Sequence, residues 1–270
     1  MKELFHYYDE DFGVSFTSTK KPLLTDYQMH THDDTEIFYF INGKGTYHVE
    51  GSEYKLESGD ILVMRPSEAH YIEINPNYKY DRIAINFRTD FFSAIDKESI
   101  LLKPVNERKA GKQNQYKSYD FESDNYKKYI QNIVSSTGDI RTNIISNLMP
   151  LLNEIYHAYK TRENEEYSND TTEYRIIRYI NKHLTSDINL DTICEKYFIS
   201  KPQLCRIFKK STGSTVWQYI TIKRLLLAKQ MINEGENPTH VFSKCGFNDY
   251  SSFYRAFVKN FGYSPKEEKN

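Results

Sequence analysis

The fold is decided by two segments in the last third of the chain, FISKPQLCRIFKKSTG from Phe198 to Gly213 and FNDYSSFYRAFVKNFG from Phe247 to Gly262. Five aligned positions are identical, and the two members of every pair are 49 residues apart. The identical pairs are Phe198 and Phe247, Arg206 and Arg255, Phe208 and Phe257, Lys210 and Lys259, and Gly213 and Gly262. A repeat without gaps predicts two helix–turn–helix units joined by one long helix.

The sequence around the repeat has the period of short amphipathic helices. EYRIIRYINKHL, from Glu173, and LDTICEKYF, from Leu190, predict the first two helices. Ser200 is a typical N-cap for the next helix, because Pro202 follows it in the first turn. The joining helix is expected over Val216–Glu234.

The outward positions of the two copies are rich in Arg, Lys, Gln, Ser and Tyr, which can contact both phosphates and base edges in a major groove. These candidate DNA-binding residues are Lys201, Gln203, Arg206, Lys209 and Lys210 in the first copy and Tyr250, Ser251, Ser252, Tyr254, Arg255 and Lys259 in the second. Residues 171–270 hold 16 Lys and Arg against 9 Asp and Glu, a balance of +7, although the whole chain has a net charge of −1. A basic end behind an acidic body indicates that the C-terminal part meets a polyanion.

The stretch Glu173–Pro265 resembles the DNA-binding domain of AraC-type transcriptional regulators, most closely in GFNDYSSFYRAFVKNFGYSP from Gly246. The resemblance implies that two recognition helices enter successive major grooves of double-stranded promoter DNA. It also implies a homodimer, with RNA polymerase as a further partner. In that family, the positions of Pro202 and Cys205 often carry larger or polar contact residues. We therefore expect Arg206 to be the main specific contact of the first helix.

The first hundred residues, 1–100, have the pattern of a β-domain. Short apolar stretches alternate with turn residues at intervals of roughly ten residues, the spacing of a sandwich or barrel. Gly43–Gly45 and Glu50–Glu53 look like hairpin turns, and Tyr80–Phe87 looks like a strand. The fold class is therefore α+β with two domains, in which a β-barrel precedes an all-α domain at residues 173–270.

A connector and helical region is expected at 101–160, between these two domains. Its helix has an apolar stripe formed by Ile140, Ile144, Leu148, Leu151, Leu152, Ile155 and Tyr159. This stripe could pack on the barrel or against the same helix of a second subunit, as a dimerisation region, and both alternatives stay open. Residues 161–172, TRENEEYSNDTT, have no apolar periodicity and are expected to form a linker.

The segment HTHDDTE places two histidines and a glutamate near the start of the β-domain. The pattern His30-x-His32-x3-Glu36-x6-Gly43 resembles the first motif of the cupin barrel, and GDILVMRPSEAH, which ends at His70, resembles the second. In metal-binding cupins, three histidines and a glutamate converge on one divalent cation. Imidazoles at i and i+2 of a strand face the same side of the sheet. Such a donor set suits Fe(II), Mn, Ni or Zn.

Three functions fit these four residues. In the first, the cupin-like pocket binds a small polar effector, such as a sugar, through His30, His32, Glu36 and His70 and thereby controls DNA binding or dimer geometry. In the second, the same residues hold a divalent metal. The third is a metal-dependent cupin enzyme fused to a DNA-binding domain. We rank them in this order and expect no enzyme, because no nucleophile with its base, phosphate-binding loop or dinucleotide fingerprint accompanies the motif.

The remaining composition predicts a cytoplasmic protein without a membrane partner. No apolar run approaches the ~20 residues that span a bilayer, and the N-terminal MKELFHYYDEDFG has no signal-peptide pattern. Cys194, Cys205 and Cys245 form no CxxC pair, which favours a reducing compartment.

Overall fold

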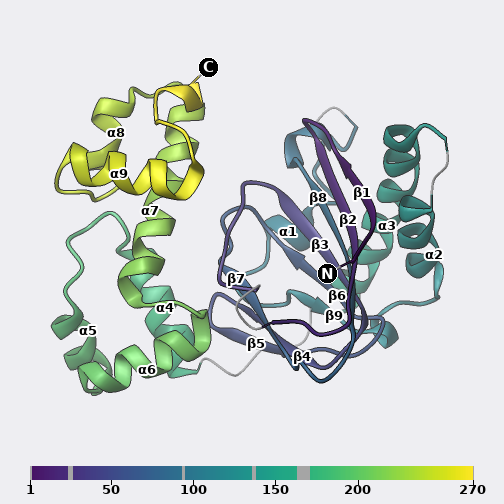
Figure 1. Cartoon of the computed structure of the whole chain (residues 1–270), viewed down its shortest axis with the longest axis horizontal. Coiled ribbons are helices and arrows are strands. Elements are labelled where there is room, and N and C mark those ends of the chain that lie inside the picture. The colour runs from purple at the N-terminus through teal and green to yellow at the C-terminus, as the bar shows by residue number, and fades with distance from the viewer. Residues whose placement is uncertain (1, 24–26, 93–94, 136–137, 163–170, 270) are drawn as a thin grey trace. The chain divides into compact units, whose positions relative to one another are not determined.

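The computed structural model describes residues 2–23, 27–92, 95–135, 138–162 and 171–269. The chain divides into two compact units, Met1–Ser168 and Asn169–Asn270 (Figure 1). The first unit contains all the strands and the second is helical. The predicted linker at 161–172 lies mainly at 163–170, outside the described residues.

The first unit contains two antiparallel sheets. The larger has the strand order β1 (Lys2–Tyr8), β2 (Phe12–Thr19), β8 (Tyr80–Phe87), β3 (Thr35–Asn42), β6 (Ile61–Met64) and β9 (Gln115–Tyr116). The smaller has the order β5 (Ser52–Lys55), β4 (Gly45–Val49) and β7 (His70–Ile74). The expected barrel is therefore, over the described residues, a sandwich of two separate sheets.

The two faces of the larger sheet form two cores. On β8, Ile83 and Ile85 belong to one hydrophobic cluster, and Tyr80 belongs to the other. The first cluster lies between the sheet and the helices α2 (Asn125–Val134) and α3 (Ile140–Arg162), which run alongside the sheet in Figure 1. The second lies between the two sheets, where Phe38 of β3 contacts Tyr47 of β4. Because successive side chains of a strand point to opposite faces, the larger sheet is packed on both sides. The first unit therefore has three layers, which are the helices, the larger sheet and the smaller sheet.

The turn predictions were partly right. Tyr80–Phe87 is a strand, and the predicted turn at Glu50–Glu53 joins β4 to β5 in a hairpin. Gly43–Gly45 does not close a hairpin, because β3 pairs with β6 and β8 whereas β4 pairs with β5 and β7. This turn instead carries the chain from one sheet to the other, with Gly43 at φ 142°.

The helical region of the first unit settles the two alternatives for its apolar stripe. Every stripe residue is buried within the same chain except Ile140, which is half-buried. Because this face already packs against the sheet and α2, it is not free for a second subunit. The segment expected to be a connector also holds the short helix α1 (Lys103–Asn106), strand β9 and the 3-10 turn η3 (Ser118–Asp120). A further 3-10 turn, η2 (Thr89–Phe92), lies before this segment.

The second unit consists of the six predicted helices and a final 3-10 turn. They are α4 (Thr172–Lys182), α5 (Leu190–Tyr197), α6 (Lys201–Thr212), α7 (Val216–Asn233), α8 (Pro238–Lys244), α9 (Tyr250–Phe261) and η4 (Glu267–Lys269). Ser200 caps α6 and Asp249 caps α9, each through its side-chain oxygen, at equivalent positions of the repeat. Gly213 and Gly262 end the same two helices at φ 71° and 83°.

One pair of the repeat differs between the copies. Phe247 packs on Phe253 in the core, whereas the side chain of Phe198 is 95% exposed. The two copies differ in the turn between their helices. The residue with a left-handed backbone is Gly246 in the second copy but Phe198 itself, at φ 55°, in the first. Phe198 therefore turns outward at the end of α5. No helix among the described residues is long and apolar enough to cross a membrane.

Candidate effector pocket and DNA-reading helices

A pocket of about 750 Å³ opens between the two sheets of the first unit. It is lined from β8 by Tyr80, Arg82, Ala84 and Asn86, and from the other elements by Ser15, Tyr27, Gln28, Met29, His30, His32, Glu36, Phe38, Tyr47 and Ile72. Its size is typical of small-molecule sites, and its wall mixes aromatic rings with a few polar groups. The pocket can therefore hold a small polar ligand.

The four predicted residues of the cupin motif come together beside this pocket, where His30, His32 and Glu36 line the wall and the buried His70 lies against them. One ligand atom from each of His30, His32, Glu36 and His70 lies within 4.8 Å of the others. We had expected His30 and His32 to lie on a strand, but neither lies on a regular strand. Instead, the backbone of His30 forms an isolated bridge with His70, with N–O distances of 3.0 and 3.1 Å. This bridge holds the segment before β3 against β7.

Each of the three rings donates its Nδ1 hydrogen to a backbone carbonyl. The acceptors are the oxygen atoms of Gln28 for His30 at 3.0 Å, of Asp34 for His32 at 2.9 Å, and of Glu68 for His70 at 2.7 Å. A carbonyl only accepts, so each Nδ1 carries hydrogen and the lone pair of the neutral ring is at Nε2. This is the arrangement that orients metal-ligating histidines in proteins.

The Glu36 carboxylate lies among these Nε2 atoms, 2.8 Å from that of His32 and 3.5 Å from that of His70. A lone pair facing a carboxylate is repulsive, so either a proton or a metal cation must lie between them. Burial alone would raise the pKa of Glu36, but hydrogen bonds from both rings hold it well below its usual range. The two histidines thus keep this carboxylate charged.

The surroundings of His32 and His30 shift the pKa values of the two rings in opposite directions. Burial opposes a charge on His32, but the hydrogen bond and negative charge of Glu36 outweigh it and raise the pKa of His32. The ring of His30 reaches the surface, yet loss of water around it and repulsion from His70 lower its pKa to about 4. At neutral pH, the Nε2 atom of His30 is therefore unprotonated and able to accept a cation.

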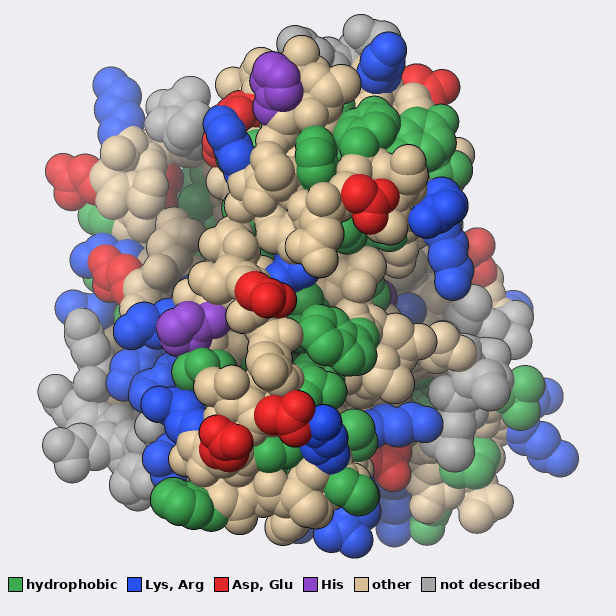
Figure 2. All heavy atoms as spheres, turned by 90° about the vertical axis from the view of Figure 1, so that its left-hand side faces the viewer, with side chains coloured by type: hydrophobic (Ala, Val, Ile, Leu, Met, Phe, Trp, Pro, Cys, Tyr) green, Lys and Arg blue, Asp and Glu red, His purple; other side chains and the backbone are tan. Residues whose placement is uncertain are grey.

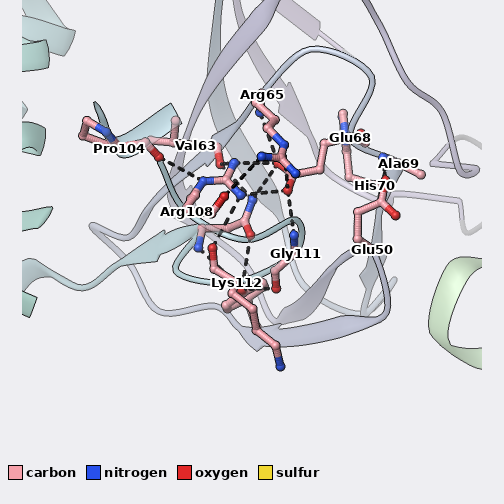
Figure 3. Close-up of polar contacts among 12 residues, drawn as sticks. Glu50, Val63, Arg65, Glu68, Ala69, His70, Pro104, Arg108, Gly111 and Lys112 are labelled. Atoms are coloured by element: carbon pink, nitrogen blue, oxygen red, sulfur yellow. Dashed lines mark hydrogen bonds and ion pairs between the residues drawn. The ribbon is translucent and has the colours of Figure 1, made fainter. Parts of the chain in front are cut away.

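A fully buried ion pair lies behind His70. The Arg108 guanidinium donates to both Glu68 carboxylate oxygens, at 2.6 and 2.7 Å, and to the backbone oxygen of Val63 at 2.9 Å (Figure 3). The backbone N–H of Gly111 also donates to Glu68 at 2.7 Å. Burial opposes the ionisation of Glu68, but the charge and hydrogen bonds of Arg108 lower the pKa of this carboxyl group to about 2. This network fixes the carbonyl that orients His70.

Arg82 lines the pocket and was missed by the sequence interpretation. A signal was present in YDRIAINF, where Tyr80, Arg82 and Asn86 alternate with the apolar Ile83 and Ile85. The period of two places the polar set on the opposite face of β8 from the helix-side core. An Arg on the inner face of a sandwich strand indicates a pocket.

The candidate DNA-binding residues lie on α6 and α9. Arg206, Lys209, Lys210, Arg255 and Lys259 are exposed, as are Gln203, Ser251 and Tyr254. Figure 2 shows the side of the molecule shown at the left of Figure 1, where Lys and Arg side chains gather at the lower left. The exposed cations of these two helices are suited to contact with a polyanion.

Three of the predicted DNA-contacting residues are engaged within the second unit. Tyr250 is half-buried and packs on Phe242 and Phe253, so only part of its ring faces outward. Its ring completes the core at the start of α9. Ser252 is half-buried, and its backbone N–H donates to the side chain of Asp249, the N-cap of α9. The Lys201 ammonium is exposed but pairs with Asp191 at 2.7 Å.

Comparison with known proteins gives matches in both units. Residues 16–134 match the model of an AraC-like ligand-binding domain, and residues 193–270 match that of a helix-turn-helix domain. The chain is 23% identical to the HTH-type transcriptional activator RhaS of Escherichia fergusonii over 88% of this chain and 86% of that protein. It is 40% identical to the probable transcriptional regulator LumQ of Photobacterium leiognathi over 33% of this chain and 37% of that protein. The unsaturated fatty acid bound structure of ToxT from Vibrio cholerae covers 96% of this chain and 95% of its own, with 14% identity and a TM-score of 0.43.

Proposed function

Since the chain belongs to the AraC-type transcriptional regulators, with a ligand-binding domain before a DNA-binding helix-turn-helix domain, we propose that a small polar effector in the pocket between the two sheets controls its binding to DNA. The observation that supports this most directly is the convergence of His30, His32 and Glu36 in the wall of the pocket of about 750 Å³, with the buried His70 behind them. Convergent polar groups in an aromatic-lined cavity are typical of an effector site.

The mechanism that we propose is a shift between two arrangements of the regulator. An effector changes DNA binding only if it binds one arrangement more tightly than the other. Since the pocket wall includes residues 27–32, which reach His70 through a backbone bridge, a ligand would order this segment against β7. We propose that the ordered state changes how α6 and α9 of two subunits meet paired DNA sites, and that RNA polymerase responds to the result.

The DNA contacts that we propose are the exposed cations of the two recognition helices. Arg206 and Arg255 would reach base edges, while Lys209, Lys210 and Lys259 would contact phosphates. The charge balance of +7 over residues 171–270 supports this assignment. Sensing is the favoured use of the pocket because the similar RhaS protein is a transcriptional activator, so we propose no catalytic role.

A second candidate is a divalent cation held by the four residues of the motif. It is favoured by the Nδ1 hydrogen bonds of His30, His32 and His70, which direct all three Nε2 lone pairs away from the backbone. Three imidazoles and the Glu36 carboxylate form a donor set that suits Fe(II), Mn, Ni or Zn. When bound, such a cation would supply a Lewis-acidic anchor for an oxygen atom of the effector.

The proposed function is tested with the full-length protein and the DNA that it selects from a random library. The dissociation constant for this DNA is measured by fluorescence anisotropy with panels of sugars and of organic acids. We expect one class of compounds to change the affinity of the wild type but not of the His30→Ala/His32→Ala variant. His157→Ala, outside the pocket, is the matched control. A compound that acts equally on all three proteins would contradict an effector site at these histidines.

A further inference from the structure

Arg82 occupies the middle of β8, opposite Thr17 of β2 and Phe40 of β3. Its side chain lines the pocket together with those of Tyr80 and Asn86 on the same face of the strand. Within the described part of the chain, its guanidinium forms no hydrogen bond and no ion pair within 4.0 Å. The arginine is thus directed into the cavity and not used to fasten the fold.

The charge of Arg82 has no directly contacting partner inside the pocket among the described residues, although the more distant Glu36 carboxylate attracts it and helps to raise its pKa. Glu36 is the only acidic side chain among the described lining residues, and His32 and His70 already engage its carboxylate. An arginine cannot lose its proton to escape burial, as a lysine can. A half-buried guanidinium gives up part of its hydration, and none of its N–H donors has an acceptor among the described residues, so its place in the pocket wall indicates a role in binding.

The neighbours of Arg82 add polar groups that also lack partners. The Tyr80 hydroxyl and the Asn86 Oδ1 atom are both buried, and neither has a hydrogen-bond partner among the described residues. Tyr27 packs edge-on against Tyr80 at 5.4 Å, so aromatic rings flank this end of the pocket. A ligand placed here meets one cation, a phenolic donor and apolar ring faces.

We infer that the effector is a small organic anion whose carboxylate or phosphate pairs with Arg82, rather than a neutral sugar. The planar guanidinium matches two oxygens of such a group in a bidentate contact. The rest of the ligand would lie on the tyrosine rings and extend toward the histidine cluster. This inference rests on the proposed function, because it assumes that the pocket between the sheets is the effector site.

The first arm of the test uses the ligand-free full-length protein. Thermal unfolding midpoints are compared for the wild type, Arg82→Met and Arg88→Met, in which the substituted arginine is exposed just beyond the end of β8. We expect Arg82→Met to unfold at the same temperature as the wild type or higher, since the half-buried Arg82 guanidinium forms with the described residues no hydrogen bond and no close ion pair that the substitution would break. A midpoint several degrees lower, with Arg88→Met unchanged, would show that Arg82 fastens the fold and would overturn the inference.

The second arm uses matched ligands. Acetate and benzoate are compared with acetamide and benzamide, and with inorganic phosphate and neutral monosaccharides, at constant ionic strength. We expect carboxylates or phosphate to raise the wild-type midpoint more than the amides do, and to bind Arg82→Met about 10- to 100-fold more weakly. Stabilisation by monosaccharides alone, or by acids equally in both proteins, would overturn the inference. Anion binding that leaves the affinity for DNA unchanged would refute the proposed function but not the anion site.

Discussion

The Nδ1 atom of His70 lies 2.7 Å from the backbone oxygen of Glu68, whose carboxylate is held on both oxygens by the fully buried Arg108. The orientation of the buried His70 ring, which lies against Glu36 of the pocket wall, therefore depends on an ion pair that is itself outside the pocket. Arg108 follows α1, and Gly111, which also binds Glu68, lies before β9. Arg108 and Gly111 of the connector segment thus both bind the carboxylate of Glu68, the residue whose backbone oxygen orients His70.

Replacing Arg108 by Ala should cost about 3–5 kcal/mol of the free energy of unfolding, because it leaves the buried Glu68 carboxylate without its hydrogen-bonded cation and with only the longer contact to Arg65. Urea denaturation of the full-length protein measures this loss. Arg88→Ala removes an exposed pair with Asp90 and should change the free energy by no more than about 1 kcal/mol. Equal effects of the two substitutions would show that the buried network does not hold the fold.

The metal alternative predicts a near-stoichiometric cation that depends on the motif. Protein purified without an affinity tag and supplied with Fe(II), Mn, Ni or Zn should retain one of these metals, and His30→Ala/His32→Ala should lose it. Elemental mass spectrometry measures the content, with His157→Ala as the control. The same low content in all three proteins would assign these residues to the polar wall of an organic-effector pocket.

The sequence predicted the parts of the molecule that depend on local pattern. The cap of α6 follows from Ser200 beside its helix, and β8 from its pattern as a strand. The convergence of His30 and His70 followed only from the resemblance to a known motif. No spacing rule joins two residues that are 40 apart in the chain, and the structure replaces the expected strand at His30 by one backbone bridge to β7.

Long-range relationships were beyond what the sequence could show. Glu68 and Arg108 are 40 residues apart, and neither stands in a pattern that marks it as buried. The two copies of the repeat align without a gap, yet the left-handed residue lies at Phe198 in one and at Gly246 in the other. Phe198 and Phe247 are identical aligned residues, but the turn is shifted by one position between the two copies, and the alignment does not show this shift.

We expect the contribution of His32 to the free energy of unfolding to depend on pH in opposite ways in the metal-free and the metal-bound protein. The raised pKa of His32 gives stability that is complete below about 6.5 and is lost as pH rises through the folded value. The lowered pKa of Glu36 gives stability that is present above about 4.5 and is lost as pH falls. In the metal-free protein, wild type should therefore exceed His32→Gln most clearly between these two values.

A bound metal requires unprotonated imidazoles, so its stabilisation should increase as pH rises. The difference in free energy of unfolding between wild type and His32→Gln, measured from pH 4.5 to 8 with a chelator and with added metal, gives the sign directly. A difference that falls above pH 6.5 in both conditions would exclude a metal that involves His32.

The lysines of the recognition helices should affect binding through salt. Each phosphate contact that is removed should reduce the slope of log K against log salt by about one. Lys209→Ala and Lys259→Ala are expected to do so equally on selected and random DNA, because phosphates have no sequence. Lys244→Ala on α8, whose ammonium pairs with Glu236, serves as the control and should leave the slope unchanged. A slope unchanged by Lys209→Ala would remove that residue from the interface.

The two repeated arginines should instead affect specificity. Arg206 and Arg255 are both exposed and lie at equivalent positions of α6 and α9, so each can reach base edges in its own groove. Arg206→Ala and Arg255→Ala should each weaken binding to selected DNA by about 1–3 kcal/mol and relax the preference at one position of the site. Repeating the selection with each variant shows which half of the site becomes degenerate. If both variants lose the same affinity for selected and random DNA, the arginines contact phosphates alone, and the sequence must be read by other side chains of the two helices.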